Sequence, residues 1–254
     1  MLYFTTSWDD GSLHDIRLSK LLSKHHMTGT FYVPEQFDFR GAKFNTFGRL
    51  INADEIRNIS SVHEIGAHTL RHVSLTTLTL DRADIEIRES KRILEDIIER
   101  PVNMFSFPNG MYTNELLMLV ASAGYRGARN THKLNFHITQ DRFQMGVTIQ
   151  VAPFPLRMMD KSHYYWRRIL DPLLSYKQHL VLHPTLFFAS HWRLLAMRAF
   201  LYARARGNYF HLYGHSWEIE KYDMWNEVEN FFVWVRTHTN VAYVTNGQCI
   251  EQQV

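Results

Sequence analysis

Short apolar runs and longer amphipathic segments alternate along the chain. Runs rich in β-branched and aromatic residues predict strands, and segments whose apolar residues recur every third or fourth position predict helices. The strands are predicted at residues 2–7, 28–33, 63–67, 102–107, 125–129, 147–151, 179–182, 209–213 and 241–245. The helices are predicted at residues 14–25, 54–59, 81–99, 114–123, 164–176, 190–206 and 222–236.

Residues 81–99 form the most regular of the predicted helices. We expect Ile85, Leu94 and Ile98 to line the side of this helix that packs against the rest of the protein. Glu86 and the charged residues around it are expected on the other sides of the helix. The segment therefore has the pattern of an amphipathic helix that covers a sheet.

The regular alternation of strands and helices predicts a parallel sheet with crossover helices, an α/β fold. About seven or eight β/α units in 254 residues favour a barrel related to the TIM barrel over an open sheet. The chain has neither a linker-like segment nor an internal repeat. We therefore expect a single domain over residues 1–254.

Composition and charge narrow the choice of partner and compartment. Hydrophobic residues make up 45% of the chain and charged residues 21%, which suits a large buried core. The net charge is +3 without any run of Lys or Arg, so we expect no nucleic-acid partner. The chain has one cysteine, Cys249, and shows neither a secretory signal nor an apolar stretch long enough to span a membrane. A cytoplasmic protein without stable membrane insertion is expected.

Polar residues with catalytic chemistry follow several predicted strands at their C-terminal ends. Asp9 and Asp10 follow the first strand, and the segment 68–72, with two histidines, follows the third. Arg129 ends the strand at 125–129, and His215 follows the strand at 209–213. In a β/α barrel these strand ends form one rim, and that rim carries the active site.

Asp9, Asp10 and Gly11 could form either a turn or part of this site. Side chains of adjacent residues in a strand point to opposite faces, so two neighbouring carboxylates do not normally share a pocket. Glycine at the end of a strand allows the backbone to turn and to direct both carboxylates to one place. One could then bind a metal while the other acts as a base. Taken alone, the pattern favours an ordinary turn with a helix cap.

His68 and His72 are spaced for joint metal binding. Residues four apart lie on the same face of a helical turn, where two imidazoles can bind one ion. Such pairs also arise by chance in a chain that contains 15 histidines. Two histidines together with one carboxylate form a plausible catalytic site for Zn²⁺ or a similar ion, and the combination is more specific than either part.

These motifs together resemble the polysaccharide deacetylases, also known as the NodB-homology or carbohydrate esterase 4 family. The stretch Thr6-Ser7-Trp8-Asp9-Asp10-Gly11 resembles the first motif, usually Thr-Phe-Asp-Asp-Gly, and His68-Thr69-Leu70-Arg71-His72 matches the His-Ser/Thr-x-x-His motif. One branch of the family has segments similar to residues 89–95, 105–110, 124–129 and 214–218. The resemblance covers most of the chain.

The resemblance implies a distorted (β/α)7 barrel that hydrolyses an N-acetyl group, or less often an O-acetyl group, on a sugar. It implies that Asp10, His68 and His72 bind a divalent ion such as Zn²⁺ or Co²⁺. The general base would be Asp9, the general acid His215, and the backbone N–H of Asn109 would help to stabilise the oxyanion. An amine is a poor leaving group as an anion, so an acid is needed to protonate the departing nitrogen.

The chain also departs from the family pattern in two places. The arginine that commonly opens the third motif and pairs with the base is missing, because Phe105, Ser106 and Phe107 occupy that stretch. No clear counterpart exists for the Asp-x-Trp motif that tunes the acid histidine. We predict that Arg129 takes the place of the missing arginine beside Asp9. The alternative is that Arg129 contacts a substrate carboxylate or phosphate.

Residues beside the motifs supply the predicted substrate contacts. These residues are Trp8, Phe107, Pro108, Arg129 and Trp217. His211 shares one strand face with Tyr213 and His215, and could line the pocket, but a packed core histidine is the simpler interpretation. The oligomeric state is left open.

The expected function is that of a metal-dependent deacetylase acting on an N-acetylated sugar. The substrate could be a polysaccharide or a cytosolic nucleotide- or lipid-linked precursor. One alternative is hydrolysis of another amide, such as a cyclic ureide. A second is a non-catalytic carbohydrate-binding barrel, although binding alone requires neither a base nor an acid.

Overall fold

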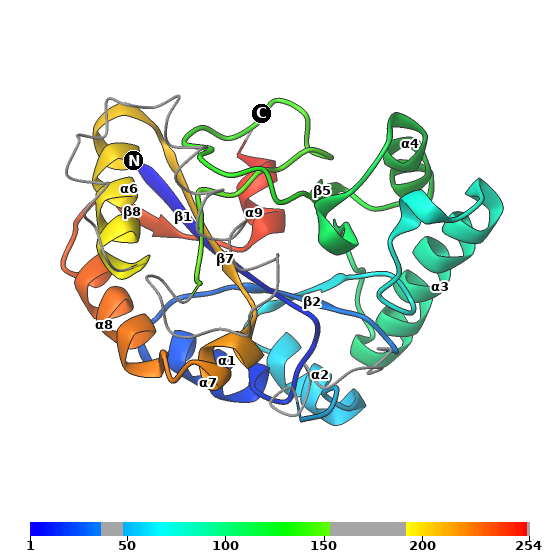
Figure 1. Ribbon diagram of the computed structural model, residues 1–254, viewed down its shortest axis with the longest axis horizontal. Helices are drawn as coiled ribbons and strands as arrows, with labels where there is room; N and C mark the ends of the chain where they lie inside the picture. Colours follow the sequence, from blue (N-terminus) through cyan, green and yellow to red (C-terminus); the bar gives the residue numbers. More distant parts are fainter. Residues whose placement is uncertain (37–47, 153–191, 253–254) are drawn as a thin grey trace, which may run out of the picture.

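The fold is a strongly curled parallel sheet with helices along its outer face (Figure 1). The computed structural model describes residues 1–36, 48–152 and 192–252. The strands are β1 (Leu2–Asp9), β2 (Thr30–Val33), β3 (Glu64–Ala67), β4 (Met104–Ser106), β5 (Gly127–Arg129), β6 (Ile149–Gln150), β7 (Tyr209–Gly214) and β8 (Val241–Tyr243). The helices are α1 (Asp15–Lys24), α2 (Ala53–Ser60), α3 (Leu80–Ile98), α4 (Asn114–Ser122), α6 (Trp192–Arg206), α7 (Ser216–Lys221), α8 (Trp225–Arg236) and α9 (Asn246–Glu251). Short 3₁₀ turns lie at Leu75–Thr77 and Pro108–Gly110.

The sheet is organised around β1. The strand order is β5-β4-β3-β2-β1-β7-β6, and β8 also pairs with β1. One edge of β1 pairs with β7, while the other edge pairs first with β8 and then with β2. A bridge between Arg129 and Met145 connects β5 to the chain that leads into β6, so this chain links the two ends of the sheet. The predicted α/β fold of the distorted (β/α)7 type is confirmed.

Most of the predicted helices and strands are present in the structure, and the differences are the following. Helices α7 and α9 were not predicted, and the helix predicted at 222–236 begins at Trp225. The strand predicted at 147–151 is reduced to Ile149–Gln150. The helix predicted at 164–176 and the strand at 179–182 lie outside the described residues, as do the first two residues of the helix predicted at 190–206.

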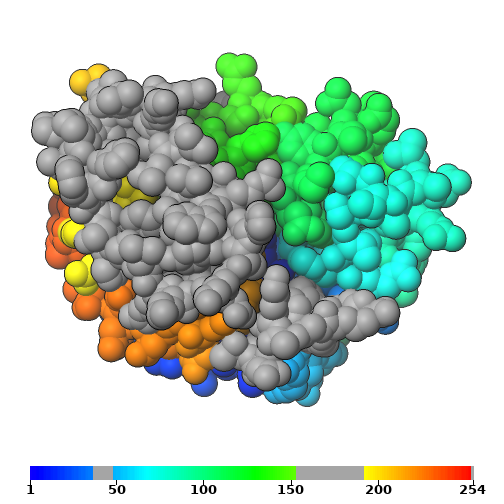
Figure 2. Space-filling view, in the orientation of Figure 1, coloured from blue at the N-terminus to red at the C-terminus, as the bar shows by residue number. Residues whose placement is uncertain are grey.

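The buried face of α3 differs from the predicted one. Ile85 is 54% exposed, although it was expected to face the core, whereas Ile87 and Leu94 are fully buried. Glu86 is also fully buried, although it was expected on a solvated side. The prediction was wrong because Ile85 and Leu94 are nine positions apart, which places them on opposite sides of a helix. Helix α3 lies on the outside of the fold, at the right of Figures 1 and 2.

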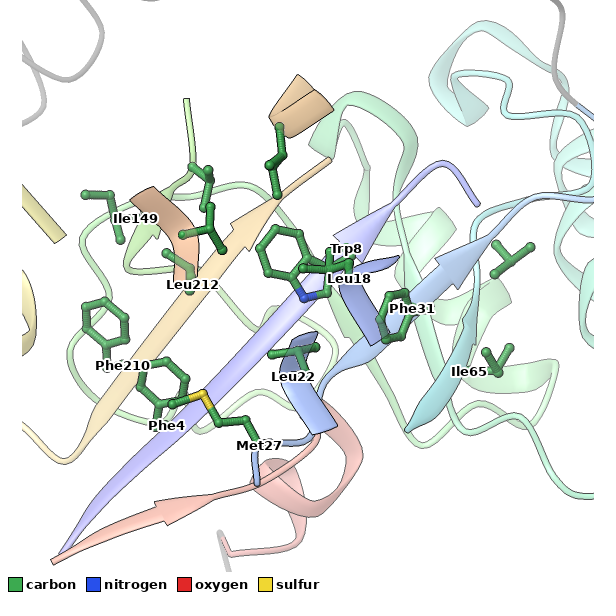
Figure 3. Packing of buried hydrophobic residues seen from close by; sticks show 14 of the residues in the cluster. Phe4, Trp8, Leu18, Leu22, Met27, Phe31, Ile65, Ile149, Phe210 and Leu212 are labelled. Atoms are coloured by element: carbon green, nitrogen blue, oxygen red, sulfur yellow. The ribbon is translucent and has the colours of Figure 1, made fainter. Parts of the chain in front are cut away.

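Apolar side chains fill the space between the sheet and its helices (Figure 3). On β1, Phe4 and Trp8 point into this layer, together with Phe31 from β2 and Phe210 from β7. Leu18 of α1 packs against them from the helix side. Side chains alternate between the two faces of a strand, so every second residue of β1 faces the helices, and Phe4 and Trp8 are among these residues.

The inner face of the sheet carries buried polar residues instead. The amide of Asn246 donates to the Thr5 hydroxyl at 2.8 Å and accepts from the Tyr32 hydroxyl at 2.9 Å. The Ser7 hydroxyl lies 2.8 Å from Nε2 of His211. We refer to Thr5, Ser7, Tyr32, His211 and Asn246 as the polar inner cluster. Polar contacts connect these side chains to one another on the inner face of the sheet.

In the described part of the chain, no helix combines the length and the apolar character that a membrane span requires. The single domain over residues 1–254 stays a prediction.

Candidate active site

The end of β1 places two adjacent carboxylates at the rim of the sheet. Asp9 is the last residue of the strand and points to its inner face, as the alternation from Trp8 requires. The chain then turns sharply, with φ of 81° at Asp10 and 62° at Gly11. This left-handed turn directs both carboxylates to the same place, as was expected from the presence of Gly11. Both aspartates are buried.

His68 and His72 lie in an irregular loop after β3. They were expected on one face of a helical turn, which is wrong, because Thr69 and His72 have φ of 63° and 52°. The two rings nevertheless lie together, with centroids 4.8 Å apart. Non-glycine residues rarely adopt such φ values, and those that do often lie at functional sites.

Asp10, His68 and His72 form a compact set of possible metal ligands. One ligand atom from each lies within 4.8 Å of the others. Nε2 of His72 is 3.1 Å from Oδ1 of Asp10, and Nε2 of His68 is 3.7 Å from the same oxygen. One carboxylate and two imidazoles at this spacing suit a zinc-like ion with coordination positions left for water or substrate.

Hydrogen bonding and burial hold His68 in the form that a ligand requires. Its Nδ1 donates to the carbonyl oxygen of Ser106 at 2.8 Å, so the lone pair of Nε2 faces the site. Burial lowers the pKa of His68 to about 4, which keeps the ring neutral. Burial alone would raise the pKa of Asp10, but the neighbouring His215 and His72 hold it well below its usual range. Asp10 is therefore ionised and His68 neutral near neutral pH.

Trp217 forms a hydrogen bond with the carboxylate of Asp10. Its indole N–H donates to Oδ2 of Asp10 at 2.9 Å, which leaves Oδ1 towards the two histidines. Trp217 was predicted to contact substrate, and the structure gives it this second contact that fixes the orientation of the carboxylate.

Arg129 lies directly against Asp9. Its Nη2 donates to both carboxylate oxygens of Asp9, and also to the Ser106 hydroxyl at 2.7 Å. The guanidinium carbon lies 4.6 Å from the centroid of the Tyr213 ring and 5.1 Å from that of Tyr32. Arg129 is fully buried, so the geometry favours the predicted pairing with Asp9 over a contact with substrate.

His215 has an acidic partner, Glu218, that was not predicted. Its Nδ1 donates to Oε2 of Glu218 at 2.8 Å, and Nε2 faces Asp10 and the Tyr213 hydroxyl at 3.9 and 3.5 Å. Burial alone would lower the pKa of His215, but Asp10 and Glu218 raise it to about 9. The signal was present in the sequence, because Glu218 follows His215 by three residues at the start of a helix.

The loop after β4 carries the remaining predicted residues. Asn109 and Gly110 have φ of 59° and 69°, and a Cβ on Gly110 would lie 2.1 Å from the Thr131 hydroxyl oxygen. This tight turn requires glycine at position 110. Phe107 and Pro108 are buried, so the structure gives no exposed surface for their predicted contact with substrate.

Trp8 and His211 both belong to the packed interior. Trp8 is fully buried in the layer beneath the helices, and its indole donates to the Thr6 hydroxyl at 3.1 Å. The predicted contact of Trp8 with substrate is therefore corrected: the side chain faces the opposite way from Asp9. His211 lies 2.8 Å from the Ser7 hydroxyl and 2.7 Å from that of Tyr209, and burial lowers its pKa to about 3.

Comparison with known proteins gives one family and a shared fold. The model of the family "Polysaccharide deacetylase" matches residues 3–128. No curated protein matches the chain. A putative polysaccharide deacetylase from Mycobacterium smegmatis aligns over 99% of this chain and 89% of that chain, at 14% identity and a TM-score of 0.64.

Two further structures are similar at low identity. A family 4 acetyl xylan esterase from Clostridium thermocellum, in complex with a cobalt ion, aligns over 98% of this chain and 91% of that chain, at 13% identity and a TM-score of 0.57. A polysaccharide deacetylase from Bacillus cereus aligns over only 56% of this chain and 45% of that chain, at 19% identity and a TM-score of 0.46. At 14% and 13% identity, the matches to the structures from Mycobacterium smegmatis and Clostridium thermocellum establish the fold alone.

Proposed function

Because residues 3–128 place the chain in the polysaccharide deacetylase family, we propose that it hydrolyses the acetamido group of an N-acetylated sugar in a reaction that requires a divalent ion. The observation that carries the proposal is the arrangement around Asp10. A triad suited to a metal lies between a carboxylate held by Arg129 and a histidine held by Glu218. Hydrolysis requires these three functions, and they are adjacent here.

Asp10, His68 and His72 would hold the ion, with Zn²⁺ or Co²⁺ as the candidates. Such an ion supplies a Lewis acid for the acetyl carbonyl and makes water more acidic. The protein prepares the site before the ion binds, because the carbonyl of Ser106 orients His68 and the indole of Trp217 orients Asp10. The triad is therefore preorganised by side chains that do not bind the ion themselves.

Asp9 is placed to accept a proton from the attacking water. Arg129 binds both of its oxygens and so fixes the plane of the carboxylate. Nε2 of His68 is 3.8 Å from Oδ2 of Asp9, so the base lies beside the triad. A base in this position acts on a water held between it and the triad.

His215 is placed to protonate the departing nitrogen. The bond from Nδ1 to Glu218 directs Nε2 towards the triad. Asp10 and Glu218 raise the pKa of His215 to about 9, which favours the protonated ring that an acid requires. The backbone N–H of Asn109, in the left-handed turn after β4, is the candidate donor to the oxyanion.

Hydrolysis of an N-acetylated sugar fits the site better than either alternative, a non-catalytic carbohydrate-binding barrel or hydrolysis of a cyclic ureide. A purely carbohydrate-binding barrel would gain nothing from a buried Asp9–Arg129 pair and a protonated His215, because both serve proton transfer. The description of the family that matches residues 3–128, polysaccharide deacetylase, favours a sugar over a cyclic ureide. Whether the sugar is part of a polymer or of a nucleotide- or lipid-linked precursor is an outcome of the assay, and the cytoplasmic location stays a prediction.

The test begins with metal content. Purified protein loaded with Zn²⁺ should contain about one ion per chain, and His68→Ala should lose it. His137→Ala, which changes an exposed histidine, is the matched control and should retain the ion. Stoichiometric zinc in His68→Ala would refute the ligand assignment.

Acetate release from a panel of N-acetylated glycans and nucleotide sugars then tests the reaction. The wild type should release acetate, and chelation should abolish the activity. Asp9→Asn should keep its zinc and lose about 10²-fold or more in kcat, as is usual for an acid–base residue. Binding of a glycan by the zinc-loaded protein without any turnover would instead support the non-catalytic barrel.

A further inference from the structure

Glu86 is a buried carboxylate beneath the loop that carries the two histidines. It lies in the second turn of α3, an outer helix, yet its side chain is fully buried. An ionised carboxylate without a partner would be strongly disfavoured there. The neighbours of Glu86 therefore indicate what the carboxylate does.

Both oxygens of Glu86 bind a single residue of the loop, Arg71. The backbone N–H of Arg71 donates to Oε2 at 3.0 Å, and Nε of its side chain donates to Oε1 at 2.6 Å. About half of the Arg71 side chain is exposed, with 55% accessible. One carboxylate thus holds the main chain and the side chain of Arg71 at the same time.

Arg71 lies immediately before His72, whose φ of 52° is uncommon for a residue with a side chain. Such a conformation persists only where the surroundings fix it. On the other side of the loop, the carbonyl of Leu70 accepts a hydrogen bond from the backbone N–H of Gln36 at 2.9 Å. Gln36 and Glu86 together hold the two sides of the Leu70–Arg71 peptide bond, one residue before His72.

We propose that Glu86 is a positioning residue of the metal site, which fixes the backbone before His72 so that its imidazole meets Asp10 and His68. This inference rests on the proposed function, because it takes the triad as the metal site. Glu86 lies on helix α3, whereas the triad lies in the turn after β1 and the loop after β3, and in the described contacts Glu86 binds none of the triad's side chains. Its influence passes through the backbone of Arg71.

The proposal predicts a loss of metal affinity that is separate from any loss of stability. Glu86→Gln keeps the size of the side chain but has one acceptor oxygen for two N–H donors, so one donor loses its partner. We expect the dissociation constant of Zn²⁺ to rise about 10- to 100-fold, as is usual when a partner of a metal ligand is removed. Competition with a chromophoric chelator measures it.

Two matched variants separate the possible causes. Glu89→Gln changes a partly exposed glutamate of the same helix, which pairs with Arg92, and should leave zinc affinity unchanged. Arg71→Met removes the side-chain contact but keeps the backbone N–H, so its affinity should fall less, by about 3- to 10-fold. If Glu86→Gln failed to fold, the loss in Arg71→Met would still decide the question.

The outcomes distinguish this inference from the proposed function. Wild-type protein that does not bind zinc would overturn the proposed metal site itself. Wild-type protein that binds zinc, together with unchanged affinity in a folded Glu86→Gln, would overturn only the role of Glu86. A fall in thermal stability of the metal-free variant without any change in affinity would also overturn that role, because it would show that Glu86 merely packs α3 against the loop.

Discussion

The two faces of β1 are held in place by different forces. Towards the helices, Phe4 packs its ring against Phe210 and Phe200, with centroids 5.4 and 6.2 Å away. Towards the interior, the next residue, Thr5, accepts a hydrogen bond from Asn246. One strand therefore joins a layer stabilised by removal of apolar surface from water to an interior stabilised by directional hydrogen bonds.

The outer face of β1 therefore contributes mainly to the stability of the fold, and the inner face mainly to the position of the site residues. Apolar packing has little directional requirement, so a substitution in the outer layer mainly changes the free energy of unfolding. Hydrogen bonds of the inner face fix angles as well as distances, and the same face leads directly to Asp9 and Arg129 at the rim. Substitution of a polar residue on the inner face should disturb the geometry of the site even where the protein still folds. Four variants test the distinction.

The largest effect is expected in the outer layer. Phe4→Ala removes a fully buried ring that contacts aromatic side chains of β7, α6 and α8. We expect the free energy of unfolding to fall by about 3–5 kcal/mol, the usual range for such a truncation. Chemical denaturation measures it. Activity per folded molecule should stay close to that of the wild type, and a large loss of kcat in the folded fraction would contradict the division between the two faces.

Arg129→Met tests the rim end of the inner face. The variant removes the guanidinium that binds both oxygens of Asp9, so the base loses its orientation. We expect kcat to fall about 10- to 100-fold, or ~1.4–2.7 kcal/mol of barrier. Steady-state kinetics measures the change.

Two controls accompany that variant. Arg126→Met changes an arginine whose side chain is 63% exposed and should leave kcat unchanged. Arg129→Lys keeps the positive charge without the planar donors and should recover part of the lost activity. A higher KM with normal kcat in Arg129→Met would instead assign Arg129 to substrate binding.

Much of the fold followed from the sequence because period-two and helical patterns report which faces are buried. The strands of the first half were predicted at nearly the correct residues, since apolar runs such as that of β1 have few alternatives. Helix α7 was not predicted because it has only six residues and begins directly after His215. A pattern that short contains less than two turns, too few to show a period.

The site was predictable where motifs carry the chemistry and less so where tertiary contacts do. Asp10, His68 and His72 could be grouped from their spacing and from the resemblance to the family. The contact of Trp217 with Asp10 joins residues 207 positions apart, and no local pattern reports such a pair. Glu86 was placed on the wrong side of its helix, so its contact with Arg71 could not be anticipated.

Thr5→Val tests the interior of the inner face with an isosteric change. The hydroxyl of Thr5 accepts a hydrogen bond from the Asn246 amide at 2.8 Å, and valine leaves that donor with one partner fewer. We expect the free energy of unfolding to fall by about 1–2 kcal/mol, less than for Phe4→Ala, because the packing is retained. Denaturation in urea measures it. A more stable Thr5→Val would show that the polar inner cluster does not depend on this bond.

Glu218→Gln should give the smallest effect, and a diagnostic one. Burial alone would lower the pKa of His215, and the charges of Asp10 and Glu218 raise it to about 9, so the acid form is present below that pH. Loss of the Glu218 charge removes part of that rise, and the alkaline limb of the activity profile should therefore move to lower pH. A divalent ion on Asp10 would offset the charge of Asp10, which leaves Glu218 as the principal anion beside the ring.

Glu218→Gln should lower kcat only slightly, because the ring of His215 keeps its orientation. Glutamine can still accept from Nδ1 of His215, so we expect kcat at neutral pH to fall only about 3- to 10-fold. Glu220→Gln, on the same helix but hydrogen-bonded to Trp225, is the control and should leave the limb in place. Activity measured over a pH series separates the two variants. An unmoved alkaline limb in Glu218→Gln would mean that the limb does not report on His215, and the assignment of the general acid would have to change.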